Sequence, residues 1–280
     1  MIKSAKKISK ESRSSFYYAF SLLPSAKRDA MNTVYAFCRK TDDIVDDENE
    51  TIEAKEKKLE EWESEFKNAI SNKSQIPLLN DVIEKVNKFN IPTKPFFDII
   101  DGMKMDLNKK RYETFEDLKE YCHKVASTVG LMTIPIFGYK NKETIKYAEN
   151  LGVALQLTNI IRDIKTDASI GRIYLPQEDL KKFDYSEKDL LSNVYNDQFI
   201  QLMKFQVERA KTYYGKSNGN VVREDKGNLF AARAMQHIYE RLLQKIETEN
   251  YNVYDKKINV SKRNKIFISL AVWAKYKLVY

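Results

Sequence analysis

The sequence predicts an all-α fold, and three observations support this prediction. Only 8 of the 280 residues are glycine and 6 are proline, whereas strand-rich folds need frequent turn residues. Hydrophobic residues make up 42% of the chain and aromatic residues 12%, which is ample for a folded core. Apolar residues recur at three- and four-residue steps along most of the chain, as in amphipathic helices. We therefore expect about ten helices in a single domain spanning 1–280, with 1–12 loosely ordered.

The first half of the chain predicts five helices. Ser25 follows a proline and is expected to cap the first of them. Thr114-Phe-Glu-Asp117 has the pattern of a capping box, with Asp in the acidic place. Pro135 and Gly138 are expected to close the helix that follows this box. In order, we expect helices over 25–47, 48–73, 82–89, 96–106 and 115–135.

The second half continues the helical pattern. A central helix is predicted over 144–167, and Gly171-Arg-Ile-Tyr-Leu-Pro176 reads as a loop. Ser186-Glu-Lys-Asp189 is a second candidate capping box. Two amphipathic helices, over 199–214 and 229–246, are expected to be joined by a polar turn at 215–220. Ser261 is expected to cap a last helix.

Charge and cysteine content restrict the partners. The formal net charge is +8, with 48 basic and 40 acidic residues interleaved, so an anionic membrane face or a polyphosphate ligand is attractive. No nucleic-acid-binding motif or basic block occurs, and we expect no nucleic-acid partner. The two cysteines, Cys38 and Cys122, form no disulfide framework. We expect a cytoplasmic protein without a spanning segment, in peripheral contact with the inner face of the membrane through its last helix.

One polar stripe lies inside the apolar central helix. Gln156, Asn159, Asp163 and Asp167 follow one another at steps of three, four and four residues, which places them on one helical face. A polar stripe on an apolar helix must face a hydrated cavity, a metal or charged partners, because unpaired burial is costly. The sequence therefore predicts a site along this face.

A second stripe, made by Tyr35, Arg39, Asp42 and Asp46, repeats this arrangement at steps of four, three and four. Aspartates four apart on a helix repel one another, and hard divalent cations relieve that repulsion. An Asp pair four apart is also common on solvated helix faces, so spacing alone leaves both interpretations open. Arg39 and Arg162 lie next to the two carboxylate pairs, where Arg is well shaped to hold a diphosphate.

Six segments carry a recognisable pattern, in a consistent order over most of residues 12–265. They are Ser15-Phe-Tyr-Tyr-Ala-Phe20, Tyr35-Ala-Phe-Cys-Arg-Lys-Thr-Asp-Asp-Ile-Val-Asp46, Gly102-Met-Lys-Met-Asp106, Tyr121-Cys-His-Lys-Val-Ala-Ser-Thr-Val-Gly130, Gln156-Leu-Thr-Asn-Ile-Ile-Arg-Asp163 and Gly171-Arg-Ile-Tyr-Leu-Pro176. These segments resemble the squalene/phytoene synthase family. Within it, Tyr121-Cys-His and Arg172-Ile-Tyr-Leu-Pro-Gln-Glu-Asp-Leu180 look most similar to the bacterial presqualene diphosphate synthases of the hopanoid type.

The resemblance implies an isoprenoid synthase fold, a single helical bundle around a central cavity. It implies head-to-head joining of two prenyl diphosphates to presqualene diphosphate. The hopanoid-type resemblance favours stopping there, and a second step to squalene or dehydrosqualene stays open. By resemblance, Mg²⁺ or Mn²⁺ is bound by Asp42, Asp46, Asn159, Asp163 and Asp167. Catalysis is assigned to those aspartates with Tyr121, Arg39 and Arg162. Substrate contacts are assigned to Tyr35, Gln156, Asn159, Tyr239, Lys256, Arg172, Ser15 and Phe16.

Some assignments depart from the family pattern or stay open. Lys256 stands where an Arg is expected, which keeps the charge and loses the planar, two-bond geometry of a guanidinium.

NADPH is not favoured, since no dinucleotide fingerprint occurs. Farnesyl diphosphate is preferred as the substrate, with geranylgeranyl diphosphate and phytoene synthesis as the alternative. Two other functions stay open: a chain-elongating synthase or terpene cyclase, and a non-catalytic protein of the same fold. The sequence does not decide between a monomer and a dimer. Phe16, Phe20, Phe37 and Tyr121 are candidates to face a carbocation.

Overall fold

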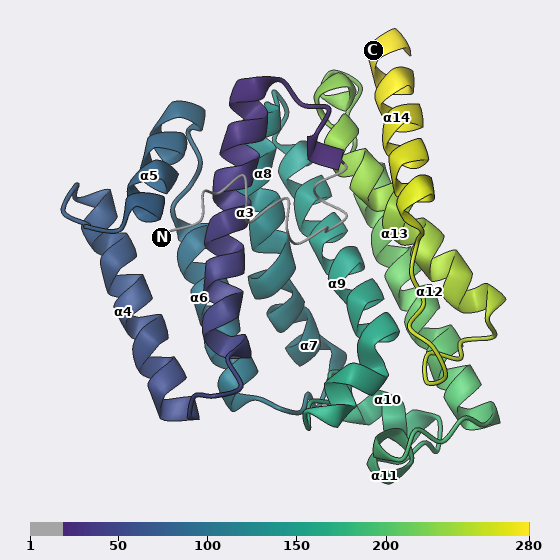
Figure 1. Ribbon diagram of the computed structural model, residues 1–280. Helices are drawn as coiled ribbons and strands as arrows, with labels where there is room; N and C mark the ends of the chain where they lie inside the picture. Colours follow the sequence, from purple (N-terminus) through teal and green to yellow (C-terminus); the bar gives the residue numbers. More distant parts are fainter. Residues whose placement is uncertain (1–18, 280) are drawn as a thin grey trace.

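The computed structural model describes residues 19–279, and every regular element in this range is helical (Figure 1). Ser15, Phe16 and the segment 1–12, for which we made predictions, lie outside these residues. The helices are α3 (Ser25–Asp46), α4 (Ile52–Ile70), α5 (Pro77–Phe89), α6 (Lys94–Asn108), α7 (Phe115–Cys122), α8 (Thr128–Phe137), α9 (Glu143–Ser169), α10 (Gln177–Lys182), α11 (Glu187–Leu191), α12 (Asp197–Gly219), α13 (Phe230–Thr248) and α14 (Lys262–Val279), with a π-helical turn η1 (His123–Ser127) and a 3₁₀ turn η2 (Lys226–Asn228).

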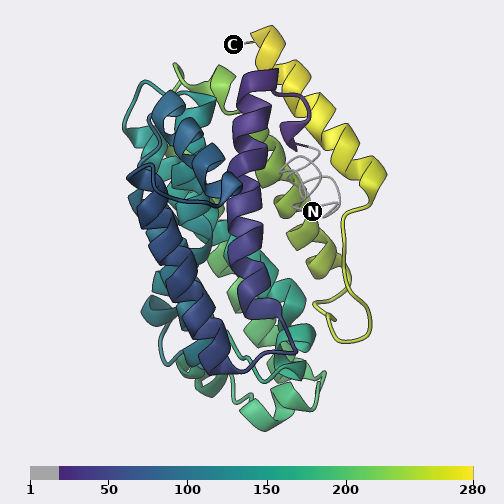
Figure 2. The ribbon, with the colours of Figure 1, turned by 60° about the vertical axis from the view of Figure 1, so that its left-hand side comes forward.

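The long helices stand roughly side by side in a bundle. In Figure 1, α3 and α9 run in the same direction while α8 returns in the opposite one. α8 packs against both α3 and α9, and α13 packs against α9 from the other side. α4 and α5 cover the outside of α3 and α6, whereas α12 lies along α9 and α14 along α13 (Figure 2). The predicted all-α bundle is thus confirmed in the described residues.

Local sequence signals explain where several helices begin. Both predicted capping boxes form, because the side chains of Thr114 and Ser186 accept the backbone N–H three residues ahead and Asp117 and Asp189 return the bond. Ser261 accepts a hydrogen bond from the N–H of Asn264 at the start of α14. The predicted cap at Ser25 is wrong. It is the first residue of α3, which follows Pro24 and has no side-chain cap.

The predicted turn over 215–220 is also wrong, because α12 continues to Gly219. Ser217 is fully buried and its hydroxyl donates to the carbonyl of Tyr214, one turn earlier. Gly215 and Lys216 are exposed on the opposite face. A polar run that resembles a turn is therefore the solvated face of a helix whose other face is packed.

The core is one contiguous cluster of buried side chains that extends from Ala19 to Tyr276. Phe37 lies in an aromatic group with Trp62, Phe66 and Phe96, with ring centroids 5.0–5.5 Å apart. Phe37 is fully buried there and does not line the cavity described below. Our expectation that it faces a carbocation is therefore wrong. Within residues 19–279, no helix carries an apolar run of sufficient length to span a bilayer.

Helices α7 and α8 form one rod that is interrupted by the π-helical turn η1. Turns of this kind are rare and recur near functional sites. The rod approaches α9 closely at Gly152, where a methyl group in place of the glycine hydrogen would lie 2.4 Å from the Cα of Ser127. No side chain fits at that distance. The close contact at this glycine thus determines the position of α9, and of the polar stripe that it carries, relative to η1.

Candidate active site

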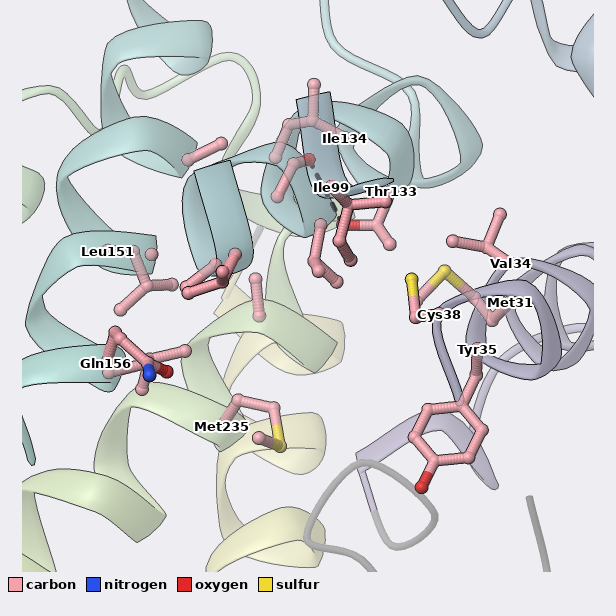
Figure 3. A pocket seen from close by; sticks show the side chains of 18 of the residues that line it. Met31, Val34, Tyr35, Cys38, Ile99, Thr133, Ile134, Leu151, Gln156 and Met235 are labelled. Carbon is pink, nitrogen blue, oxygen red and sulfur yellow. Dashed lines mark hydrogen bonds between the residues drawn. The ribbon is translucent and has the colours of Figure 1, made fainter. Parts of the chain in front are cut away.

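A cavity runs through the bundle between α3, α8, α9 and α13 (Figure 3). Its volume is about 260 Å³. Met31 and Cys38 of α3 face it from one side, Leu151 and Gln156 of α9 from the other, and Met235 of α13 closes a third side. These four helices therefore enclose an open space, and their facing side chains do not fill it.

The cavity is polar at one end and apolar at the other. Because α3 and α9 run the same way, residues late in both helices meet at one end, where Arg39, Asp42 and Asn159 lie. The early residues and their neighbours Phe20 and Phe137 meet at the other end, which is closed by aromatic and aliphatic side chains. Such a space suits a long apolar molecule with a charged head. Tyr35, Gln156 and Tyr239 also line it, as we predicted for substrate contacts.

On α3, the aspartates lie close together, and the nearby arginine does not pair with Asp42 or Asp46. Burial raises the pKa of Asp42 to about 7, and the carboxylate of Asp46 one turn away adds to the rise. Arg39 lies beside them, but its guanidinium forms its ion pair with Asp43 at 2.7 Å. Asp43 is exposed on the outer side of the helix. Asp42 thus lines the cavity while the nearest arginine is paired elsewhere, and Asp46, one turn further along α3, is exposed.

On α9, the corresponding row already has cationic partners. The Nε of Arg162 donates to Asp163 at 2.9 Å, and a second guanidinium nitrogen completes a two-bond contact. The ammonium of Lys257 lies 3.4 Å from the same carboxylate. Burial opposes ionisation, but the hydrogen bond and charge of Arg162 hold the pKa of Asp163 below its usual range. Asp167 differs, because burial and the Asp163 charge raise its pKa to about 7.

Asp106 connects the two rows electrostatically. Its charge contributes to the raised pKa of Asp42 on one side and of Asp167 on the other. Its two carboxylate oxygens accept hydrogen bonds from Tyr121 at 3.0 Å and from Tyr174 at 2.8 Å. Burial raises the pKa of Tyr121 well above its ordinary value, so this hydroxyl stays protonated and donates. Tyr121 therefore orients Asp106 and is not available as a base.

Arg172 lies close to this acidic group and lines a small pocket together with Asp167 and Tyr174. Burial acts to lower the pKa of its guanidinium, but the charges of Asp106 and Asp46 and the neighbouring tyrosines raise it. Conversely, Arg172 limits the rise in the pKa of both Asp106 and Asp167. The predicted substrate contact Arg172 is thus placed between the rows, close to members of each.

The donor set fits a hard divalent cation. The Oδ1 atom of Asn159 is buried, and it accepts no hydrogen bond from any described residue. An orphaned amide oxygen beside repelling carboxylates is suited to a cation. Within residues 19–279, however, no three His, Cys, Asp or Glu side chains are close enough to hold a metal ion alone. The residues thus match Mg²⁺ bound by one or two carboxylates, a neutral oxygen and oxygens of a phosphate ligand.

One predicted substrate contact is not brought to this group. Lys256 pairs with Glu249 at 2.9 Å and is largely exposed, while its neighbour Lys257 faces Asp163. The chain runs there without helix or strand, so periodicity gave no basis to choose between the two lysines. Lys265 was also missed. Its pKa is lowered by burial and by the charge of Arg162, which places a third cation beside the α9 row.

Comparison with known proteins agrees with this geometry. The family model for squalene/phytoene synthase matches residues 9–264. The chain belongs to the squalene/phytoene synthase family. A 15-cis-phytoene synthase of Synechococcus elongatus is 35% identical over 257 residues, which cover 88% of this chain and 83% of that protein.

Solved structures show the same fold. A crystal structure of a dehydrosqualene synthase in complex with ligand superposes with a TM-score of 0.85 at 32% identity, covering 98% of this chain and 95% of that one. The structure of squalene synthase HpnC from Alicyclobacillus acidocaldarius gives 0.78 at 26% identity, with coverage of 89% and 95%. The predicted isoprenoid synthase fold and family are therefore confirmed, and the chain is a prenyltransferase of this type. Head-to-head condensation of prenyl diphosphates follows as its reaction class.

Proposed function

We propose that the chain joins two farnesyl diphosphate molecules head to head, releases one diphosphate and forms presqualene diphosphate. The observation that carries this proposal is the cavity, which is lined by Arg39, Asp42 and Asn159 at one end and closed by apolar and aromatic side chains at the other. The acidic end with its arginines suits a diphosphate bridged by cations. The apolar end suits the hydrocarbon tail.

The stretch of the cavity along α3 matches a farnesyl tail in length. This stretch, from Met31 to Asp42, spans about 16 Å at roughly 1.5 Å per residue. An extended chain advances about 1.2 Å per bond, so a farnesyl tail of about twelve main-chain carbons measures about 14 Å. A geranylgeranyl tail, with about sixteen, measures about 19 Å and would also occupy the apolar end lined by Phe20 and Phe137.

Two sets of residues would assist the loss of diphosphate from the donor: the cation-binding aspartates and a group of basic side chains. When bound, Mg²⁺ would be held by Asp42, Asp46, Asn159, Asp163 and Asp167 and would neutralise the leaving diphosphate. Arg162, Lys257 and Lys265 form a cationic edge beside the α9 row, where they can hold a departing diphosphate. As the C–O bond of the donor breaks, an allylic cation remains. The double bond of the acceptor attacks it, and loss of one proton closes the cyclopropane ring.

The cavity must then protect the cation. Its lining is mainly aliphatic and aromatic between the two ends, which keeps water from the reacting carbons. Phe20 borders the cavity and presents an aromatic face that can stabilise a cation without reacting. Tyr121 stays protonated, so we assign proton acceptance to the released diphosphate rather than to this tyrosine.

A second candidate is phytoene synthesis from two geranylgeranyl diphosphates. It is favoured by the sequence relatives, since three cyanobacterial phytoene synthases are 33–35% identical to this chain. The two candidates share the rows and differ only in how far the tail extends into the apolar end.

The test is product analysis. Purified protein is incubated with each diphosphate and Mg²⁺, with and without NADPH, and products are identified by mass spectrometry. We expect a thirty-carbon cyclopropyl diphosphate from farnesyl diphosphate, no dependence of its formation on NADPH, and at least tenfold lower kcat/KM with geranylgeranyl diphosphate. A forty-carbon product formed faster would replace the first candidate by the second. A longer linear diphosphate or a cyclic terpene would contradict both.

A further inference from the structure

Helix α14 carries an apolar stripe on its outer face as well as on its inner one. The inner face packs against α13 through Val272 and Tyr276, which are buried. On the outer face, Phe267 is 72% exposed, Leu270 46% and Leu278 85%. The exposed Ala271 and the half-buried Ala274 lie between them. These steps of three and four residues produce a continuous apolar line along the helix, parallel to its axis.

This concentration is unusual for the molecule. Of the nine large hydrophobic side chains that are exposed in residues 19–279, four belong to α14. The other five do not form such a line: Ile52 and Ile70 lie at opposite ends of α4, and Leu191 lies at the end of α11. Single exposed apolar residues are normal on protein surfaces, whereas a contiguous apolar patch marks an interaction site.

The charge around the stripe has one sign. Residues 256–280 contain seven of the 48 basic residues and none of the 40 acidic ones, so this segment carries +7 of the net charge of +8. Arg263 precedes Phe267 by one turn, and Lys275 lies beside Leu278; both are exposed. An apolar line with cationic neighbours is the pattern of a helix that lies in the plane of an anionic lipid surface.

We propose that the outer face of α14 docks the enzyme on the surface of an anionic membrane. The charge distribution favours lipid over a second copy of this chain. A symmetric contact between two such helices would place arginines and lysines against one another with no acidic residue on either helix to compensate.

Helix α14 lies close to the cavity, so docking would bring the cavity close to the membrane. Its inner face lies on α13 (Figure 2). α13 in turn contributes Ala232, Met235 and Tyr239 to the cavity wall. A membrane on the outer side of α14 is thus two helix layers from the space that holds the apolar substrates. Docking would shorten the path between lipid and this space for molecules with long apolar tails. This surface does not depend on which prenyl chain the enzyme uses.

The experiment measures binding to vesicles by flotation. Vesicles of equal parts phosphatidylglycerol and phosphatidylcholine are compared with pure phosphatidylcholine. The test variant Phe267→Ser/Leu270→Ser removes the centre of the stripe, and Arg263→Gln/Lys275→Gln removes flanking charge. The matched control, Ile52→Ser/Leu191→Ser, removes exposed apolar side chains elsewhere. Circular dichroism and thermal melting establish that each variant is folded.

We expect the unchanged chain to float with anionic vesicles and not with neutral ones. The serine pair at 267 and 270 should reduce the bound-to-free ratio at least tenfold, the charge pair severalfold, and the control less than twofold. Equal binding by the stripe variant and the control, or no binding by the unchanged chain, would overturn the proposal. Sedimentation gives a further check. A dimer that becomes a monomer in the stripe variant, with vesicle binding unchanged, would assign this face to a second copy instead.

Discussion

On α9, Asp163 is held by Arg162 and approached by Lys257, whereas on α3, Arg39 directs its ion pair to Asp43 and leaves Asp42 with a pKa of about 7. The two aspartates of each row are four residues apart on both helices, so the contrast comes from their neighbours. The α9 row brings its own cations and can hold a diphosphate directly. Asp42, like Asp167 at the end of the α9 row, has a pKa raised to about 7, so an added cation favours the ionised form of both.

The largest effect is expected where the added cation matters most. Asp42→Asn should lower kcat by about 10²–10³-fold, because a neutral amide would hold the cation that neutralises the leaving diphosphate less tightly than a carboxylate does. Asp43→Asn is the matched control, since Asp43 is the adjacent aspartate and points outward. Steady-state assays with either prenyl diphosphate at saturating Mg²⁺ measure both variants. Comparable losses in the two would show that the outer carboxylate shares the role that we assign to Asp42.

The position of the α9 row relative to η1 depends on the close helix contact at Gly152. Gly152→Ala would push a methyl group to within 2.4 Å of the Cα of Ser127, a backbone atom that cannot rotate away. We expect a loss of about 3 kcal/mol in the free energy of unfolding, measured by urea denaturation, from overpacking. Gly215→Ala is the control, because no atom lies within 4 Å of the new methyl in α12. It should raise stability by about 0.5–1 kcal/mol. Unchanged stability of Gly152→Ala would mean that α9 can slide along η1.

The rows should also differ in the sign of their effect on stability. In EDTA at pH 8, Asp42→Asn should stabilise the protein by about 1–3 kcal/mol, because it removes a buried charge whose ionisation opposes folding. Asp163→Asn should destabilise it by about 1 kcal/mol, since Arg162 and Lys257 then lose their carboxylate. Thermal melting of both variants beside the unchanged chain measures the difference.

The pH dependence follows from the same pKa shifts. The folded pKa of Asp42, about 7, exceeds the unfolded value of 3.8, so the unchanged chain loses stability relative to Asp42→Asn as pH rises from about 4 to 7. The pKa of Asp163 is lowered, so its contribution is present at neutral pH and is lost as pH falls below 3.8 toward the folded value. A melting difference between Asp42→Asn and the unchanged chain that stays flat from pH 4 to 8 would contradict this account.

Much of the contrast could be predicted from the sequence, because it depends on helical periodicity. The steps between Asp42 and Asp46 and between Asp163 and Asp167 placed each pair on one helical face, and Asp42, Gln156 and Asn159 do line one cavity. Apolar spacing and capping boxes located most helices to within a few residues. These signals are local, so they survive in a single sequence.

What could not be predicted depends on contacts between distant segments. The pairing of Arg39 with Asp43 rather than Asp42 is a rotamer choice on one helix, which spacing does not determine. The role of Asp106 between the rows depends on Tyr121 and Tyr174 arriving from two other segments. Phe37 has the spacing of a cavity residue, but its neighbours Trp62 and Phe96 enclose it in the core.

The smallest expected effect separates two adjacent lysines. Lys257→Gln removes a charge 3.4 Å from Asp163, and we expect KM for the prenyl diphosphate to rise about threefold to tenfold, because the exposed lysine contributes roughly 1 kcal/mol to holding the anion. Lys256→Gln removes a charge that pairs with Glu249 on the surface, so KM should change less than twofold. Inhibition by inorganic diphosphate, measured for both variants, separates anion binding from binding of the prenyl tail. If Lys256→Gln had the larger effect, this segment would rearrange when substrate binds, and the assignment made from resemblance would be the better one.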